Sequence, residues 1–222
     1  MNGDETARIK ALRERLATLK RETERREDVL RISWLQRAYG YYIEKGYWRE
    51  AANLFAEDAT FEHGVDGVYV GRDRIYALLV KMTGGNCGPG LPFGQLNEHY
   101  QMQPVITLAE DGLTAKGRWR DMALLGQYKE WAAWGDGVYE NSYVKRGGVW
   151  MFSALRFYPN FVAPYEGGVA TLTPVEGEWR TPALADLPPD RPPTSDDRPF
   201  PDVNVPPFHY PNPVSGRAWS GR

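Results

Sequence analysis

The sequence predicts an α+β fold, in which helices come first along the chain and a long antiparallel sheet follows. Apolar residues recur at helical spacing up to about residue 82, whereas apolar and polar residues alternate from residue 95 to residue 160. A run of helices followed by a run of strands is typical of this fold class. The chain has 222 residues, of which 42% are hydrophobic and 13% aromatic, enough for one cored domain with appendages.

Charged residues with a helical pattern occupy residues 5 to 31. Their apolar neighbours follow the alternating three-four spacing of a narrow stripe: Ile9, Leu12, Leu16 and Leu19. The stripe ends before Thr23, so it is too short for a stable solitary coiled coil. We therefore expect a leader helix over residues 1–30 that packs on its own domain or on a partner subunit, with a solvated charged helix as the alternative.

Three further helices and two short strands are expected before residue 83. The helices are expected at about 28–46, 47–55 and 71–82, and the strands at 58–64 and 66–71. The loop that follows, residues 83–94, is rich in glycine and proline but lacks the Gly-Lys-Ser/Thr ending of a phosphate loop, so no nucleotide role is assigned to it. Cys87 lies in this loop without a candidate base nearby, which indicates a loop residue rather than a nucleophile.

Four consecutive strands predict an antiparallel meander, at residues 95–108, 113–126, 134–145 and 149–158. The folded domain would then cover residues 31–165. From Pro164 onward, the last 59 residues hold 13 of the 17 prolines, a composition that favours an extended arm over a second packed domain. This arm, residues 166–222, carries four aromatic residues that would anchor it: Phe200, Phe208, Tyr210 and Trp219.

The composition excludes several classes of function. A net charge of −2 does not fit a nucleic-acid binder, which needs clustered positive charge. No apolar run approaches the roughly 20 residues that span a membrane, and the first 16 residues lack the features of a signal peptide, so a cytoplasmic protein is expected. A single cysteine rules out a disulfide framework and a multi-cysteine zinc site.

Three histidines are the candidates for acid–base chemistry: His63, His99 and His209. An imidazole that a carboxylate orients can act as a general base without a cofactor. Glu44, on the tyrosine-rich second helix, is a candidate carboxylate. A metal site built from His63, His99 and Glu44 is the alternative, but no compact ligand motif supports it, so neither a metal nor a cofactor is predicted.

The order of motifs in the middle of the chain resembles one known family. The segment W-x-x-x-A-x-L-F-x-x-D-A begins at Trp48, G-R-x-x-I begins at Gly71, and YENSYVKRGGVWMFSAL begins at Tyr139. Together they resemble the SnoaL-like branch of the nuclear transport factor 2 superfamily, over about residues 30 to 165. The resemblance implies a cone-shaped α+β barrel, in which a curved antiparallel sheet around helices encloses a pocket, and often a homodimer or higher homo-oligomer.

Members of this superfamily differ in function. They include scytalone dehydratase, hexachlorocyclohexane dehydrochlorinase, ketosteroid isomerase, polyketide cyclases and non-catalytic binding proteins, so the fold alone does not settle the activity. The helix aspartate of the first two enzymes falls on Glu44, one methylene longer, and their strand histidine falls on His99. A tyrosine of scytalone dehydratase falls on His63, a departure that puts that enzyme's own substrate in doubt.

The resemblance therefore predicts that Glu44 orients His99 as the base. Candidates for a donor or an oxyanion anchor are His63, Tyr41 and Arg120, and Tyr41 lies one helical turn before Glu44. A buried arginine needs an anionic partner. Arg120, with Arg118 behind it, could thus either hold a substrate oxyanion or form a structural salt bridge to Glu44 or Glu98.

Strand alternation supplies the rest of the expected pocket wall. If His99 points inward, so do Asn97, Gln101 and Gln103. The family alignment sends Arg118, Arg120, Met122 and Leu124 inward on the next strand, and leaves Trp119 and Asp121 outside. On the last two strands it sends inward Gly137, Tyr139, Asn141, Leu155, Phe157 and Pro159, with Glu140 and Arg156 outside. Tyr39 and Phe61 complete the expected substrate contacts. A slip of one residue would reverse any of these faces.

The predicted function is a cofactor-independent lyase that acts by general acid–base catalysis on a small hydrophobic, hydroxylated aromatic molecule, with loss of water or formaldehyde. The leader helix and the FHYPNPVSG segment resemble those of lignin-derived diarylpropane γ-formaldehyde lyases, which give a stilbene; this is the most specific form of the prediction. A ketosteroid-type isomerase, a polyketide-type cyclase, and a non-catalytic small-molecule binding or assembly module are the alternatives.

Overall fold

The structure is a computed structural model that describes residues 3–82, 88–172, 184 and 186–220. Its elements, in chain order, are α1 (Gly3–Glu44), α2 (Trp48–Asn53), β1 (Phe55–His63), β2 (Val68–Val70), α3 (Arg72–Met82), β3 (Gln95–Leu108), β4 (Thr114–Gln127), β5 (Trp131–Arg146), β6 (Val149–Pro164) and the short 3-10 helix η1 (Gly168–Ala170). The interpretation of Cys87 as a loop residue lies outside the described residues.

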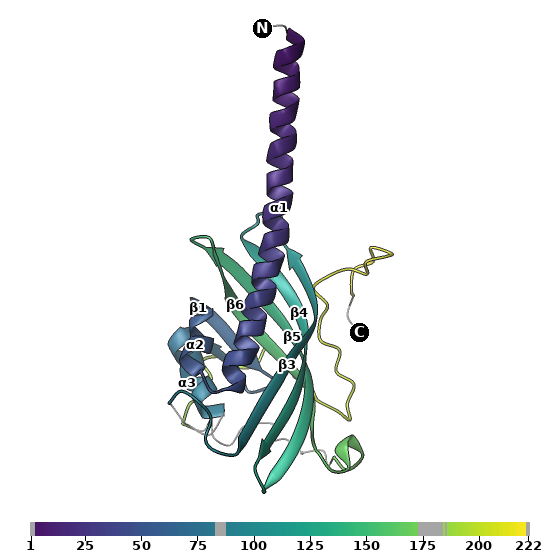
Figure 1. Cartoon of the computed structure of the whole chain (residues 1–222). Helices are drawn as coiled ribbons and strands as arrows, with labels where there is room; N and C mark the ends of the chain where they lie inside the picture. The colour runs from purple at the N-terminus through teal and green to yellow at the C-terminus, as the bar shows by residue number, and fades with distance from the viewer. Residues whose placement is uncertain (1–2, 83–87, 173–183, 185, 221–222) are drawn as a thin grey trace.

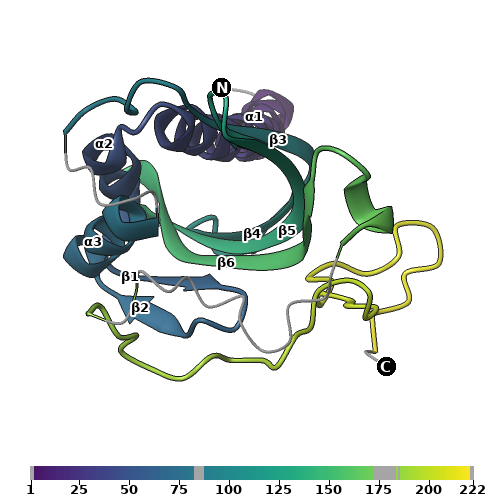
Figure 2. The same ribbon diagram turned by 90° about the horizontal axis from the view of Figure 1, so that it is seen from below.

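Six strands form one curved sheet in the order β2-β1-β6-β5-β4-β3 (Figure 1). Neighbouring strands are antiparallel, except β1 and β6, which are parallel. The long strands curl into a trough, the C-terminal half of α1 lies across its open side, and α2 and α3 cover one end (Figure 2). The predicted α+β class and the meander of β3 to β6 are therefore confirmed.

The aromatic core lies between α1 and the concave face of the sheet. Phe55 stacks on Phe152 with the ring centroids 4.9 Å apart, and Tyr39 of α1 packs edge-on against Phe152 at 5.6 Å. Rings at these separations add about 0.5–1.5 kcal/mol per pair beyond the burial of their area. This packing fixes the height of α1 above the sheet and so the width of the space that remains beside it.

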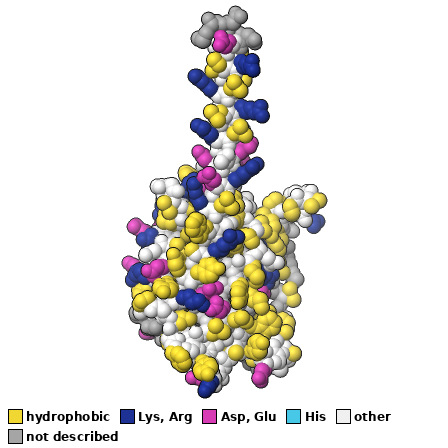
Figure 3. All heavy atoms as spheres, viewed as in Figure 1, with side chains coloured by type: hydrophobic (Ala, Val, Ile, Leu, Met, Phe, Trp, Pro, Cys, Tyr) yellow, Lys and Arg dark blue, Asp and Glu magenta, His cyan; other side chains and the backbone are white. Residues whose placement is uncertain are grey.

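A single helix, α1, replaces the two helices expected before Gly46. No proline interrupts it, and after Gly3 the next glycine is Gly40, so nothing in the sequence ends a helix near residue 30. Residues 5–27 are exposed along the projecting half of the helix (Figures 1 and 3). The apolar stripe from Ile9 to Leu19 is exposed with them. The expectation that this stripe packs on its own domain is therefore wrong, because the sheet ends before it reaches the stripe.

Asp28 joins α1 to the sheet. Its side chain is 4% exposed, and it accepts hydrogen bonds from Trp150 Nε1 at 2.8 Å, Lys145 Nζ at 2.9 Å and Arg31 Nη1 at 3.2 Å. Burial would raise the pKa of this carboxyl group, but the hydrogen bonds from Trp150 and Lys145 outweigh that effect and hold the pKa below its usual value. The carboxylate is thus the form that the folded protein requires.

Asp28→Ala is expected to destabilise the protein by about 3 kcal/mol at neutral pH, because it leaves a partly buried lysine and a buried indole N–H without their acceptor. The folded-state pKa of Asp28 is lowered, so its contribution is present above the unfolded pKa of about 3.9 and is lost as the pH falls through the folded value. Urea denaturation at pH 7 and near pH 3 measures the difference, which shrinks at the lower pH.

Asp58→Ala is the matched control for this prediction. Asp58 pairs with Arg146 at 2.9 Å, but both side chains are exposed, so water screens the pair and its removal changes the stability little. An equal loss of stability in the two variants would contradict the assignment of Asp28 as the anchor of α1.

The C-terminal segment runs extended along the convex side of the sheet (Figure 2). Arg156 of β6 donates to Ser195 Oγ at 2.6 Å and to Asp197 at 3.2 Å. Farther along, the ring of Phe208 lies 4.0 Å from the guanidinium carbon of Arg118, and Nδ1 of His209 lies 2.8 Å from Glu140. The outward position expected for Arg156 and Glu140 is therefore correct, and the C-terminal segment covers both side chains.

Candidate active site

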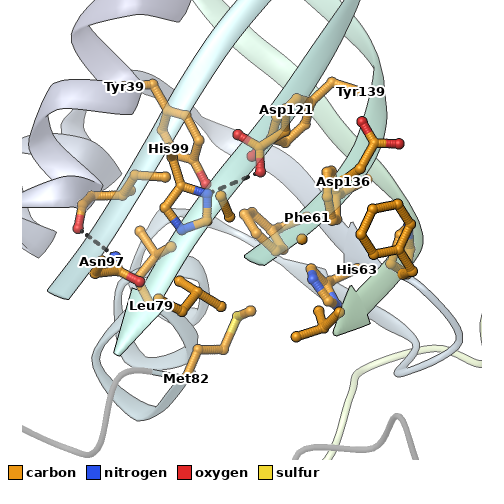
Figure 4. A pocket seen from close by; sticks show the side chains of 18 of the residues that line it. Tyr39, Phe61, His63, Leu79, Met82, Asn97, His99, Asp121, Asp136 and Tyr139 are labelled. Carbon is orange, nitrogen blue, oxygen red and sulfur yellow. Dashed lines mark hydrogen bonds and ion pairs between the residues drawn. The ribbon is translucent and has the colours of Figure 1, made fainter. Parts of the chain in front are cut away.

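A pocket of about 290 Å³ lies between α1, α3 and the concave face of the sheet (Figure 4). Its wall is mostly apolar and aromatic and includes Trp48, Phe61, Leu79, Met82 and Phe157. Its volume is at the lower end of the range for small-molecule sites, roughly 300–1,000 Å³. The pocket therefore suits a compact apolar molecule. Its few polar side chains determine which polar contacts such a molecule can make.

His99 on β3 and Asp121 on β4 form an imidazole–carboxylate pair on the pocket wall. Nδ1 of His99 lies 2.9 Å from Oδ2 of Asp121, and Gln101 Nε2 donates to Oδ1 of the same carboxylate at 2.8 Å. Asp121 is 2% exposed, so water does not compete for these contacts. Figure 4 shows the Nδ1 edge of His99 turned to Asp121 and the opposite edge of the ring turned into the pocket.

Glu44 does not orient the ring of His99, so the predicted pair is wrong. Glu44 accepts a hydrogen bond from the backbone N–H of His99 at 3.2 Å, beside Tyr41 in a separate surface hollow. Burial, together with the nearby charge of Glu98, raises the pKa of Glu44. Glu44 misses the pocket because of the helix face on which it lies. Tyr39 and Ile43, one turn apart, point to the pocket, and Glu44, one residue after Ile43, lies on another face of α1.

Tyr41 also lies outside the pocket, with 70% of its surface exposed. Its position two residues after Tyr39 turns it to the opposite side of the helix. The structure therefore gives it no contact with a molecule in the pocket, contrary to the prediction. Tyr39 is the helix tyrosine that lines the pocket.

The face predicted for β4 is wrong by one residue. β3 and β4 pair in a register that sets His99 opposite Ala123 and Gln101 opposite Asp121, so these residues share the concave face. Trp119, Asp121, Ala123 and Leu125 therefore point inward, and the four residues expected there point outward: Arg118, Arg120, Met122 and Leu124. The alternation within the strand contained this signal, because the inward set is apolar apart from Asp121.

Arg118 and Arg120 make structural contacts on the outer face of β4. Arg120 Nη1 lies 2.9 Å and 2.6 Å from the two carboxylate oxygens of Asp136, and Arg118 is paired with Glu140. The contacts therefore support the interpretation that these arginines form salt bridges. The partners are Asp136 and Glu140, whereas Glu44 or Glu98 was expected.

Six residues predicted as site residues do line the pocket beside His99: Tyr39, Phe61, His63, Asn97, Tyr139 and Phe157.

Three other predicted residues do not line it. Gln101 lies behind Asp121, on the side away from the pocket. Asn141 is buried deeper in the core, where it bonds to Gln36. Gln103 is exposed at an irregularity in the pairing of β3, with a φ of 53°, because the bulge between Met102 and Val105 breaks the alternation.

A second imidazole, His63, lies across the pocket from His99 (Figure 4). Its ring stacks on Phe157 with the centroids 5.1 Å apart, and its Nδ1 lies 3.5 Å from Asp66. Asp66 occupies the Nδ1 edge, so Nε2 is the ring nitrogen of His63 that remains for a bound molecule.

Two buried tyrosines flank the His99–Asp121 pair. Burial raises the pKa of both Tyr39 and Tyr139 well above its usual value, and the negative charge of Asp121 adds to the effect. Both phenols are therefore protonated at any physiological pH, and each can donate a hydrogen bond. The site thus combines an oriented imidazole, a second imidazole and neutral hydroxyl donors in an aromatic enclosure.

Neither a metal cluster nor a membrane span is found in the part of the chain that the structure describes. Within these residues, no three His, Cys, Asp or Glu side chains are grouped so that they could hold a metal ion. The helices described here also include none that is long and apolar enough to cross a membrane.

The comparison with protein families decides the family. The family model of the SnoaL-like domain matches residues 24–156, more than half of the chain. The chain belongs to the SnoaL-like family. The carboxylate that contacts His99 departs from the expected pattern. It belongs to Asp121 on β4, whereas the resemblance predicted a carboxylate on the first core helix. No curated protein gives a significant match to the chain.

Solved structures similar to this SnoaL-like chain include three lyase-type proteins. A candidate scytalone dehydratase from Novosphingobium aromaticivorans is 20% identical, with a TM-score of 0.56, over 65% of this chain and 91% of that chain. A type 3 hexachlorocyclohexane dehydrochlorinase from Novosphingobium barchaimii is 20% identical, with a TM-score of 0.56, over 66% and 95%. A type 2 enzyme of the same name is 21% identical, with a TM-score of 0.56, over 66% and 94%. At these identities the likeness shows the fold alone.

Proposed function

We propose that this protein is a cofactor-independent lyase that acts on a hydroxylated aromatic small molecule. The observation that carries the proposal is the 2.9 Å contact between Nδ1 of His99 and Oδ2 of Asp121 inside a mostly apolar pocket. When Nδ1–H donates to the carboxylate, Nε2 keeps its lone pair, which is what a general base needs. The buried carboxylate also offsets the positive charge that the ring acquires when it takes a proton.

The proposed elimination uses both imidazoles. Nε2 of His99 takes a proton from a substrate carbon, the C–H electron pair becomes a new C=C bond, and the neighbouring C–O bond breaks. His63 gives a proton to the departing hydroxide, which leaves as water. General acid and base groups contribute roughly 10²- to 10⁴-fold each, so the enclosure of the aromatic ring must supply the rest of the acceleration.

The narrower form of the proposal is loss of formaldehyde from a lignin-derived diarylpropane. In that reaction Nε2 of His99 takes the proton of the γ-hydroxyl, the Cβ–Cγ bond breaks to release formaldehyde, and its electron pair forms the C=C bond of a stilbene. The α-hydroxyl leaves as water with a proton from His63. Aromatic side chains of the pocket wall, such as Phe61 and Tyr139, support an aryl substrate.

Product mass tests the proposed function. The purified protein is incubated with a panel of hydroxylated aromatics, including a diarylpropane-1,3-diol and a single-ring analogue, and the products are analysed by mass spectrometry. We expect loss of water, or of water together with formaldehyde. An unchanged product mass would indicate an isomerase or a cyclase, and binding without turnover would indicate a binding module; either outcome overturns the lyase proposal.

We also propose that the exposed stripe on α1 pairs with a second copy of this chain. With Ile9 at heptad position a, two parallel copies would set like charges side by side: Arg8 with Arg13, Arg15 with Lys20, and Glu22 with Glu27. An antiparallel pair that sets Ile9 opposite Leu19 and Leu12 opposite Leu16 instead brings Arg8 close to Glu22 of the second copy at both ends of the stripe. The charges that flank the stripe therefore favour antiparallel pairing.

Replacing Leu12 and Leu16 by Glu is expected to convert a dimer into a monomer, because two charges would lie at the centre of the apolar seam. Light scattering after gel filtration should give twice 25.2 kDa for the wild type and 25.2 kDa for the double variant. Ala17→Glu, on the opposite side of the same helix, is the control and should stay dimeric. A monomeric wild type, or dissociation of the control, contradicts this pairing.

A further inference from the structure

A chain of hydrogen bonds, partly buried at Gln101 and buried beyond Gln36, extends from Asp121 into the core on the side away from the pocket. Gln101 Nε2 donates to Asp121 Oδ1 at 2.8 Å, and Gln36 Nε2 on α1 donates to Gln101 Oε1 at 2.7 Å. Gln36 Oε1 then accepts from Asn141 Nδ2 at 2.9 Å and from Tyr143 Oη at 2.8 Å. Gly40 makes room for the chain, since a Cβ at that position would lie 2.8 Å from Cγ of Gln101.

The far end of this chain contains groups that can only donate. The indole Nε1–H of Trp119 donates to Tyr143 Oη at 3.0 Å, so the hydroxyl proton of Tyr143 is free to point to Gln36. Independently, the backbone N–H of Arg156 donates to Asn141 Oδ1 at 3.1 Å. The amide of Asn141 therefore turns its nitrogen, and not its oxygen, to Gln36.

The indole N–H of Trp119 and the backbone N–H of Arg156 fix the direction of each hydrogen bond between them and Asp121. Gln36 must present its oxygen to Tyr143 and Asn141, so its nitrogen faces Gln101. Gln101 must then present its oxygen to Gln36 and its nitrogen to Asp121. A reversed amide anywhere in the chain would set two donors or two acceptors face to face, at a cost of about 1–3 kcal/mol for each buried group left unpaired. The buried position of Gln36, Asn141 and Trp119 keeps solvent from relieving that cost.

We propose that Gln101 and Gln36 are positioning residues that require the side chain at position 121 to accept a hydrogen bond on one side, and thereby hold its other side toward Nδ1 of His99. With aspartate at position 121, the second oxygen is also an acceptor, so the neutral ring carries its proton on Nδ1 and leaves Nε2 for the pocket. This assignment follows from the contacts alone; its use in catalysis rests on the proposed function.

The isosteric variant Asp121→Asn tests the direction of the chain. If Gln101 can only donate, the introduced amide must turn its oxygen to Gln101 and its nitrogen to His99. Nδ1 of His99 then has to accept, and its proton moves to Nε2. Nitrogen-15 NMR of protein labelled at histidine distinguishes the two tautomers, and only three histidines contribute signals. We expect the Nδ1–H tautomer in the wild type and the Nε2–H tautomer in Asp121→Asn.

The double variant Asp121→Asn with Gln101→Leu removes the constraint. The amide at position 121 can then rotate its oxygen to His99, so the Nδ1–H tautomer is expected to return. Asp121→Asn combined with Gln127→Leu is the matched control, because Gln127 lies at the end of β4 and bonds to Phe93, and it should keep the Nε2–H tautomer. If Asp121→Asn alone keeps the Nδ1–H tautomer, the chain does not impose a direction and the proposal is wrong.

Gln101→Leu alone supplies a kinetic readout. We expect kcat to fall about ten- to hundredfold, the range known for groups that support metal-bound histidines, with little change in KM. The NMR result does not depend on turnover, so a failure of the lyase proposal would leave the tautomer experiment intact. A rise in KM and a fall in kcat, together with a lowered melting temperature, would instead indicate general damage to the core and would count against a positioning role.

Discussion

Asp121→Asn is expected to lower kcat by roughly 10³- to 10⁴-fold while the fold is retained, a magnitude taken from the same substitution in Ser-His-Asp triads. The amide is isosteric with the carboxylate but cannot accept the proton of Nδ1 when its nitrogen faces His99. The ring then holds its proton on Nε2, where the base is needed, and the negative charge that supports the imidazolium is lost. Steady-state kinetics and a thermal melt of the same sample measure the two effects separately.

Glu44→Gln is the control for this prediction. Glu44 accepts the backbone N–H of His99 at 3.2 Å, and an amide oxygen can accept the same hydrogen bond. We therefore expect near-wild-type kcat in this variant. If Glu44→Gln proves as damaging as Asp121→Asn, the helix carboxylate is the functional partner after all, and the site proposed here is assigned to the wrong acid.

His99→Gln is expected to lower kcat by about 10²- to 10⁴-fold, the usual contribution of a general base. Glutamine can still bond to Asp121 but has no lone pair of comparable basicity to offer the substrate. Steady-state kinetics of the wild type and the variant, with a thermal melt of each sample, measure the change in kcat and show that the fold is retained.

His209→Gln separates this effect from the loss of any histidine. His209 lies on the convex side of the sheet, where its Nδ1 contacts Glu140. Its replacement leaves the pocket unchanged, so kcat should stay close to that of the wild type. A loss of activity in His209→Gln equal to that in His99→Gln would mean that neither result reports on the pocket.

The fold could be predicted because its signals are local. Alternation in β3 to β6 and the turns between them depend on neighbouring residues, and these elements lie where they were expected. The continuity of α1 was missed, although the absence of proline was visible, because the change from charged to aromatic residues near Asp28 resembled a boundary between two helices. That change marks where the sheet begins to cover the helix.

The site was only half predictable, because its polar contacts depend on long-range geometry. His99, Asn97 and Tyr39 were placed correctly, since each follows from the period of its own strand or helix. Asp121 was missed because its face depends on the register between β3 and β4, where a slip of one residue exchanges Asp121 for Arg120. Glu44 was misassigned because the angle at which α1 crosses the sheet decides which residues of a helix turn point inward.

The buried amide of Gln36 has a consequence for how this protein can change over time. A leucine of similar size would remove a desolvated polar group from the core, which in other proteins is often neutral or stabilising when the whole polar cluster is replaced. Here the cluster includes Gln101 and ends on Asp121, so a fully apolar core would also remove the support of the imidazole. Thermal stability and the proposed activity thus depend on the same few residues, so gains in stability should be found at surface positions instead.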